Sequence, residues 1–212
     1  MESSFQMLHD RDPERDSLRE MLARKSLQAG REFKLASGAL SKVYIDAKRT
    51  TCTPEAMPLI GHVFLKKIRD CGWSPDAVGG KTVGADPIAF ATARESIETI
   101  GRAISAFIVR KEPKKHGMQQ YIEGPERTEG LRVVIVDDVC TTGGSTGEAI
   151  EKARNAGMIV LGAICLVDRE EGATELLATK YQCCLESIFK LSEVLVDHGD
   201  PRVLAHPVGA HT

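Results

Sequence analysis

The sequence lacks the features of several classes of protein. No stretch of its 212 residues approaches the ~20 consecutive apolar residues that a membrane-spanning helix requires. The formal net charge is -2, so no excess of basic residues points to a nucleic acid as partner. The first residues lack a basic start followed by an apolar run, so we expect no secretory signal. These absences favour a cytoplasmic protein with neither a membrane nor a nucleic acid as its partner.

Paired cysteines are also absent. The six cysteines form no CxxC pair and no disulfide-framework spacing, which indicates reduced thiols rather than a zinc site or bridges. Hydrophobic residues make up 42% and charged residues 27%, as is usual for a globular protein. A chain of 212 residues suffices for one α/β domain with a well-buried core and is short for two.

Strands and helices are expected to alternate along the chain. Apolar patterns predict strands over 76–80, 104–109, 131–136, 159–167 and 184–189. Helices are expected from Asp16 to a stop at Gly30, from Thr53-Pro54, from Asp86-Pro87, and over 144–157 with a capping box of Ser145 and Glu148. Residues 31–49 predict a strand pair around Ser37-Gly38. This alternation predicts an α/β fold with a mainly parallel sheet flanked by helices.

The domain organisation follows from the same pattern. Residues 1–15 are polar and charged and are interpreted as an N-terminal extension. Residues 16–200 are expected to form a single domain, and 201–212 a C-terminal tail. Residues 111–130 are polar and carry no periodic apolar face, which indicates a long loop of the kind that is often functional.

The most informative segment is 133–146, VVIVDDVCTTGGST. An apolar strand ends in two carboxylates, a loop of small and hydroxylated residues follows, and a helix begins. Glycine lets the backbone approach a ligand closely, and free N–H groups at a helix start attract phosphate. The carboxylates suit sugar hydroxyls or a nearby cation. The segment therefore predicts a site for a phosphorylated sugar. The alternative is an ordinary strand–turn–helix, but two acids at a strand end are costly without a partner. The GxGxxG and GxxxxGK[ST] patterns are absent from this segment.

A second group of charges follows the strand at 104–109. Arg110, Lys111, Lys114, Lys115 and His116 form a dense set of cations on the long loop. Fixed cations stabilise the charge that builds on a leaving pyrophosphate, and a loop that excludes water protects the sugar from hydrolysis. The alternative is a solvated lysine-rich loop.

Segment 133–146 resembles the phosphoribosyl pyrophosphate motif of the type I phosphoribosyltransferases: an apolar strand, an acid pair and a Thr/Gly/Ser loop. In that family the acid pair contacts the ribose hydroxyls and the loop cradles the 5-phosphate. The resemblance implies that phosphoribosyl pyrophosphate is bound by Asp137, Asp138, Val139, Cys140, Thr141, Thr142, Gly143, Gly144 and Ser145.

The order Arg-Lys-x-x-Lys-x-His-Gly over 110–117 is similar to the orotate phosphoribosyltransferase family. The similarity implies that Arg110, Lys111, Lys114 and His116 bind the pyrophosphate end. It also implies a catalytic set of Lys111, Lys114, His116, Asp137 and Asp138. Residues 167–169 match the strand end whose arginine meets the orotate carboxylate, so Arg169 and Thr141 are expected to bind orotate. The alternative for Arg169 is a surface salt bridge.

The resemblance implies further properties. Magnesium is expected as the cofactor, held mainly through the substrate, together with a small N-terminal hood, a flexible catalytic loop, and a homodimer in which Lys111 acts in the neighbouring active site. His116 is either a proton donor or a cation. Ala36, Ala39 and Val43 depart from common family residues on the orotate side. Two other functions stay open: transfer to another base, and a regulator that senses phosphoribosyl pyrophosphate without turnover.

Overall fold

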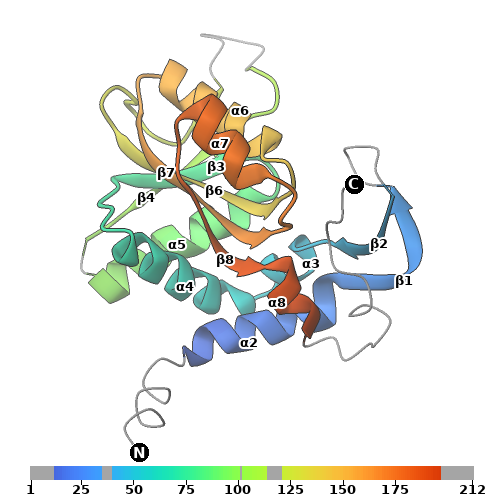
Figure 1. The fold of residues 1–212 in the computed structure, drawn as a ribbon. Coiled ribbons are helices and arrows are strands. Elements are labelled where there is room, and N and C mark those ends of the chain that lie inside the picture. Colours follow the sequence, from blue (N-terminus) through green and yellow to red (C-terminus); the bar gives the residue numbers. More distant parts are fainter. Residues whose placement is uncertain (1–11, 35–39, 101, 114–120, 197–212) are drawn as a thin grey trace, which may run out of the picture.

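The computed structural model describes residues 12–34, 40–100, 102–113 and 121–196 (Figure 1). Its main sheet has the strand order β5-β4-β3-β6-β7-β8. The strands are β3 (Ala77–Lys81), β4 (Ser105–Val109), β5 (Ile122–Glu123), β6 (Arg132–Cys140), β7 (Ile159–Asp168) and β8 (Leu185–Lys190). Neighbouring strands are parallel except β5, which runs antiparallel to β4. The predicted α/β fold with a mainly parallel sheet is confirmed.

Helices cover both faces of this sheet (Figure 1). On one face lie α4 (Ala56–Asp70) and α5 (Ala85–Ile100), and on the other lie α6 (Gly144–Asn155) and α7 (Ala173–Tyr181). Strand β6 divides its apolar side chains between the two layers. Val134 and Val136 join the core of α4 and α5, while Val133 and Ile135 join that of α6 and α7. This alternation follows from the two-residue period of a strand, and it explains the unbroken apolar run at 133–136.

Strand β6 is longer than its apolar pattern predicts. The prediction ended it at Val136, but the structure continues it to Cys140, because β7 runs beside it as far as Asp168. In the parallel register Asp137 pairs with Cys165, and Cys140 pairs with Asp168. Asp137 and Asp138 therefore lie among the last residues of β6, where it still pairs with β7, and not in the loop that follows. The two acids consequently point to opposite faces of the sheet.

The N-terminal helix is displaced relative to its prediction. Helix α2 spans Pro13–Met21, with the Asp12 side chain accepting a hydrogen bond from Arg15 N, so it begins before Asp16. A π-helical turn, η1 (Leu22–Ser26), and then β1 (Leu27–Lys34) follow, so no helix reaches Gly30. The tertiary fold decides this boundary, because the guanidinium of Arg15 donates to Ile188 O and holds the helix against β8.

A hairpin lies beside the carboxyl ends of the sheet strands (Figure 1). Strands β1 and β2 (Leu40–Ile45) are antiparallel, which confirms the predicted strand pair; the turn at 35–39 falls outside the described residues. The short helix α3 (Lys48–Thr51) follows, and α4 then begins at Ala56. The expected start at Thr53-Pro54 is wrong, because the Thr53 hydroxyl donates to Thr50 O and closes α3 instead.

The last described element is α8 (Leu191–Val196), which packs its Leu191 and Val194 into the core.

Within the described ranges, no helix has the length and apolar character that spanning a membrane would demand.

Candidate active site at the carboxyl end of the sheet

Asp137 faces helix α6 from the end of β6. Its Oδ2 accepts a hydrogen bond of 2.7 Å from the Thr146 hydroxyl, and its Oδ1 accepts one of 3.0 Å from the Asp138 amide. The residue is 6% exposed. Burial, and then the charge of Asp138, raise the pKa of Asp137 to about 7. This carboxyl is therefore held where its charged form is costly, which points to a partner that compensates.

Asp138 faces the other side of the sheet edge, toward the hairpin. Its Oδ1 accepts a hydrogen bond from the Val139 amide, and its Oδ2 lies 3.6 Å from the ammonium of Lys48. Lys48 also lies 2.9 Å from Asp46. Partial burial alone would lower the pKa of Lys48, but its bond to Asp46 and the charge of Asp138 raise it. Gly84 leaves room for this acid, since a Cβ there would stand 2.3 Å from Asp138 Oδ1.

The loop after the acid pair leads into an uncapped helix. Gly143 has a φ of 83° and is the N-cap of α6, with no side chain bonded to the first amides. The predicted capping box of Ser145 and Glu148 is wrong, because Glu148 pairs with Lys81 instead. Beside Gly144 the space is open, with no atom within 4 Å of an added Cβ. The first amides of the helix are thus available to a phosphate, as the sequence predicts for this segment.

The remaining predicted residues of this loop differ in exposure. Cys140 is buried and its sulfur lies 3.0 Å from the Thr146 hydroxyl, Thr142 and Ser145 are exposed, and Val139 and Thr141 are half-buried. Cys140 therefore supports the loop from within, while the hydroxyls of Thr141, Thr142 and Ser145 can reach a ligand.

The predicted cationic segment begins at the same edge of the sheet. Arg110 follows β4; its amide donates to Tyr121 O at 2.8 Å, and its guanidinium lies 3.1 Å from Glu123. Lys111 is exposed. Lys114 and His116 fall outside the described residues. Lys81 adds a further cation at this edge. It is the last residue of β3, the strand beside β4, and it pairs with Val109, which directly precedes Arg110.

Arg169 lies at the end of β7. It is 4% exposed, its amide donates to Cys140 O at 2.9 Å, and its Nε donates to Glu171 at 2.8 Å. Arg169 therefore forms a largely buried ion pair with Glu171 rather than the exposed surface salt bridge of the alternative. The backbone bond to Cys140 ties the guanidinium-bearing turn directly to the loop that follows the acid pair.

Sequence reasoning missed several charged residues of this edge: Lys48, Glu148, Lys152 and Glu171. Lys48 carried a signal, since it follows Val43 by five residues and the family resemblance puts Val43 on the orotate side. The other residues lie on helix surfaces or loops, where a charged side chain is ordinarily solvated and carries no sequence signal.

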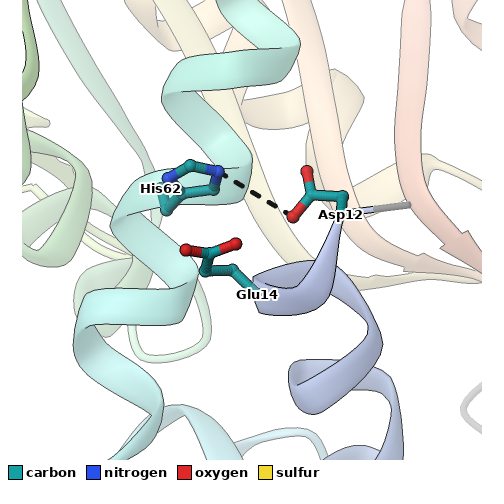
Figure 2. A group of neighbouring side chains, drawn as sticks. All are labelled: Asp12, Glu14 and His62. Carbon is teal, nitrogen blue, oxygen red and sulfur yellow. Dashed lines mark ion pairs between the residues drawn. The ribbon is translucent and has the colours of Figure 1, made fainter. Parts of the chain in front are cut away.

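A group of possible metal ligands lies elsewhere. Asp12, Glu14 and His62 bring their ligand atoms within 4.8 Å of one another, between the start of α2 and α4 (Figure 2). Asp12 already caps α2 and lies 3.6 Å from Lys66, while His62 Nε2 lies 3.8 Å from Asp12. These contacts account for the group as a connection between two helices, at the end of α2 remote from the hairpin (Figure 1).

The fold and the uncapped helix start beside the acid pair match a class of α/β proteins that bind phosphorylated sugars. A family model described as the phosphoribosyl transferase domain matches residues 50–198. The chain belongs to this family, within its orotate phosphoribosyltransferase branch.

Individual relatives agree with this membership. The orotate phosphoribosyltransferase of Aquifex aeolicus is 44% identical over 184 residues, covering 86% of this chain and 98% of the relative. A crystal structure of the Mycobacterium tuberculosis orotate phosphoribosyltransferase with Fe(III) dicitrate has a TM-score of 0.74 and 37% identity, covering 86% of this chain and 99% of that one. The same enzyme in complex with 5-phospho-alpha-D-ribosyl 1-diphosphate has a TM-score of 0.70 and 34% identity at the same coverage.

Proposed function

We propose that this chain transfers the phosphoribosyl group of phosphoribosyl pyrophosphate to orotate, giving orotidine 5'-monophosphate and pyrophosphate in pyrimidine biosynthesis. The observation that carries the proposal is the junction of β6 and α6. There one short loop joins the acid pair at the end of β6, whose Asp137 is buried, to an uncapped helix start, and the Arg169 amide is bonded to Cys140 at the end of the same strand. One end of this junction suits ribose hydroxyls, and the other suits a phosphate.

Each residue has a role in the transfer. Asp137 and Asp138 accept hydrogen bonds from the ribose hydroxyls, and residues 139–145 hold the 5-phosphate. Arg110, Lys111, Lys114 and His116 stabilise the departing pyrophosphate, which takes the electron pair of the broken C1–O bond. Orotate N1 forms the new bond to C1 and gives its proton to solvent. No side chain is needed as a nucleophile, because positioning and electrostatic stabilisation lower the barrier.

Orotate recognition falls to Arg169 and Thr141. A guanidinium matches a carboxylate through two parallel hydrogen bonds. Glu171 accepts a hydrogen bond from the Nε of Arg169, which fixes the plane of the guanidinium and leaves its terminal nitrogens for the orotate carboxylate. Removal of this arginine would therefore raise KM for orotate far more than KM for phosphoribosyl pyrophosphate.

Magnesium fits this edge as an ion carried by the substrate. Asp137 is buried and bonded to Thr146, and Asp138 is next to Lys48, so neither carboxylate offers an open set of ligands. Pyrophosphate oxygens are the hard ligands that magnesium prefers, and the bound ion would neutralise charge on that leaving group.

A homodimer is also part of the proposal. Phe90 and Ile97 lie seven residues apart on one side of α5 and are 51% and 63% exposed, which is unusual for large apolar side chains. We assign this face to a second copy of the chain, because Lys111 is expected to act in a neighbouring site.

Sedimentation should give a dimer, and a Phe90→Glu and Ile97→Glu double variant should give a monomer. Ile159→Glu, 52% exposed on β7, is the matched control. A wild-type monomer would refute this assignment.

The proposed location is cytoplasmic, since all six cysteines are unpaired and suit a reducing compartment. Fractionation of the cells that make the protein would test this.

The decisive experiment follows orotate absorbance with phosphoribosyl pyrophosphate, with and without magnesium. A magnesium-dependent fall with formation of orotidine monophosphate is expected. Lys111→Ala should abolish turnover and leave binding of phosphoribosyl pyrophosphate largely intact. Binding without turnover in the wild type would overturn the proposal in favour of a sensor, and turnover of another base would change the substrate.

A further inference from the structure

Helix α6 contacts the end of β3 and the segment that follows β4, and both lie where the pyrophosphate is proposed to bind. Glu148 and Lys152 lie four residues apart and so share one side of the helix. Glu148 forms an ion pair with Lys81 at the end of β3. The Lys152 ammonium donates to the backbone carbonyls of Arg110 and Lys111, at 3.1 and 3.2 Å.

Lys152 contacts both ends of segment 110–121. Its ammonium lies 4.4 Å from the centroid of the Tyr121 ring, in cation–π geometry. The Arg110 amide donates to Tyr121 O, which joins these two ends through the backbone. The three donors of one ammonium are therefore directed at two carbonyls and a ring that all belong to the base of this segment.

We propose that Lys152 is a positioning residue, which holds the backbone of Lys111 at a fixed place relative to the phosphate-binding start of α6. The inference rests on the proposed function for the role of Lys111. Gly144 and Lys152 are separated by two turns of helix, about 12 Å at 1.5 Å per residue. A helix of this length is rigid, so it sets the spacing between the 5-phosphate and pyrophosphate ends of one substrate.

A purely stabilising contact is the competing explanation. The cation–π pair of Tyr121 and Lys152 would stabilise the fold whether or not it has a part in the reaction. The chain contains a matched contact on α7, where the Lys180 ammonium lies 4.9 Å from the centroid of the Tyr181 ring. Lys180 makes its contact outside segment 110–121, so the same substitution there isolates the effect of position.

The experiment compares Lys152→Met with Lys180→Met in the full chain. We expect kcat to fall about tenfold or more in Lys152→Met, since small misplacement of a catalytic group is costly. The Kd for phosphoribosyl pyrophosphate without orotate should change little. Lys180→Met should leave both values unchanged, and Lys152→Arg should restore most of kcat, because a guanidinium also donates to two carbonyls. Equal kcat in the two methionine variants would overturn the inference.

Hydrogen exchange at the Arg110 amide gives a readout that needs no turnover. Exchange should be faster in Lys152→Met than in the wild type, and unchanged in Lys180→Met. If the wild type does not convert orotate, the proposed function fails, and the exchange rates still decide whether Lys152 holds this segment. Unchanged exchange in Lys152→Met refutes the inference, whatever the activity.

Discussion

The acid pair of β6 and the group at the start of α2 have similar compositions and different surroundings. Asp138 lies 3.6 Å from Lys48, and Asp12 lies 3.6 Å from Lys66. The two acid side chains are 14% and 12% exposed. The other carboxylate oxygen of Asp12 accepts a hydrogen bond from Arg15 N and so caps helix α2. Both acids have a second carboxyl nearby, but Glu14 beside Asp12 is only half-buried. Asp137 beside Asp138 is buried, and burial raises its pKa to about 7.

If the acid pair binds ribose as proposed, the difference shows how a functional cluster departs from a structural one. A carboxylate that caps a helix start lowers the free energy of the fold. Two adjacent carboxyls at a strand end raise it, and a ligand that donates to both is what compensates. Proximity of possible ligand side chains alone, which Figure 2 shows for Asp12, Glu14 and His62, therefore does not identify a site.

Asp138→Asn should produce the largest change. The amide keeps the shape but loses the charge that strengthens hydrogen bonds from two ribose hydroxyls. Such bonds contribute about 1.5–3 kcal/mol each, so kcat/KM for phosphoribosyl pyrophosphate should fall on the order of 100-fold. Steady-state kinetics checks this, with Asp12→Asn as the control. An equal loss in both variants would contradict the distinction between the two clusters.

Asp137→Asn should stabilise the protein at high pH while it reduces activity. The folded pKa of Asp137 lies above its ordinary value, so the folded state binds this proton more tightly than the unfolded state. Stability from this group is complete below the unfolded pKa, near 4, and is lost as the pH rises to about 7. Asparagine removes this loss, so the rise of this pKa from near 4 to about 7 gives an expected gain on the order of 4 kcal/mol at pH 8 and almost none at pH 4. Thermal unfolding at both values measures it, and a pH-independent difference would argue against the raised pKa.

Asp12→Ala, at the other cluster, should lower the stability of the protein and leave its activity unchanged. Loss of the N-cap bond to Arg15 N should destabilise the protein by about 1 kcal/mol, with kcat unchanged. Urea unfolding and the orotate assay check the two halves. A substantial loss of activity at unchanged stability would show that this cluster has a part in function.

The two lysines should give the smallest effects. Lys48 and Lys66 are about half exposed, so each ion pair contributes less than about 1 kcal/mol to stability. Methionine at Lys48 should nevertheless raise KM for phosphoribosyl pyrophosphate a few fold, because the acid pair loses its nearest cation. Methionine at Lys66 should leave KM unchanged. Indistinguishable KM values would remove Lys48 from the site.

Local sequence predicted the elements whose signals are local. The apolar runs at 104–109 and 159–167 became β4 and β7, since continuous apolar residues in a parallel sheet are buried on both faces. Helix α7 was missed, because Gly172 provides its start without a side-chain cap. The boundary errors at Asp16 and Gly30 arose where distant residues decide the end of an element, as Ile188 does for α2 and β2 does for β1. The error at Thr53 has a local cause, its bond to Thr50.

The sequence by itself determined the chemistry of the site: an acid pair, a glycine-containing loop and a helix start must be adjacent, because they are consecutive. Only the tertiary structure decided what surrounds them. Lys48, Lys152 and Glu171 come from other segments, and a surface charge has no periodic pattern that reveals its partner. The pairing of β6 with β7 turned Asp137 toward α6 and Asp138 toward Lys48, because the ladder extends the strand and its two-residue period beyond the apolar run.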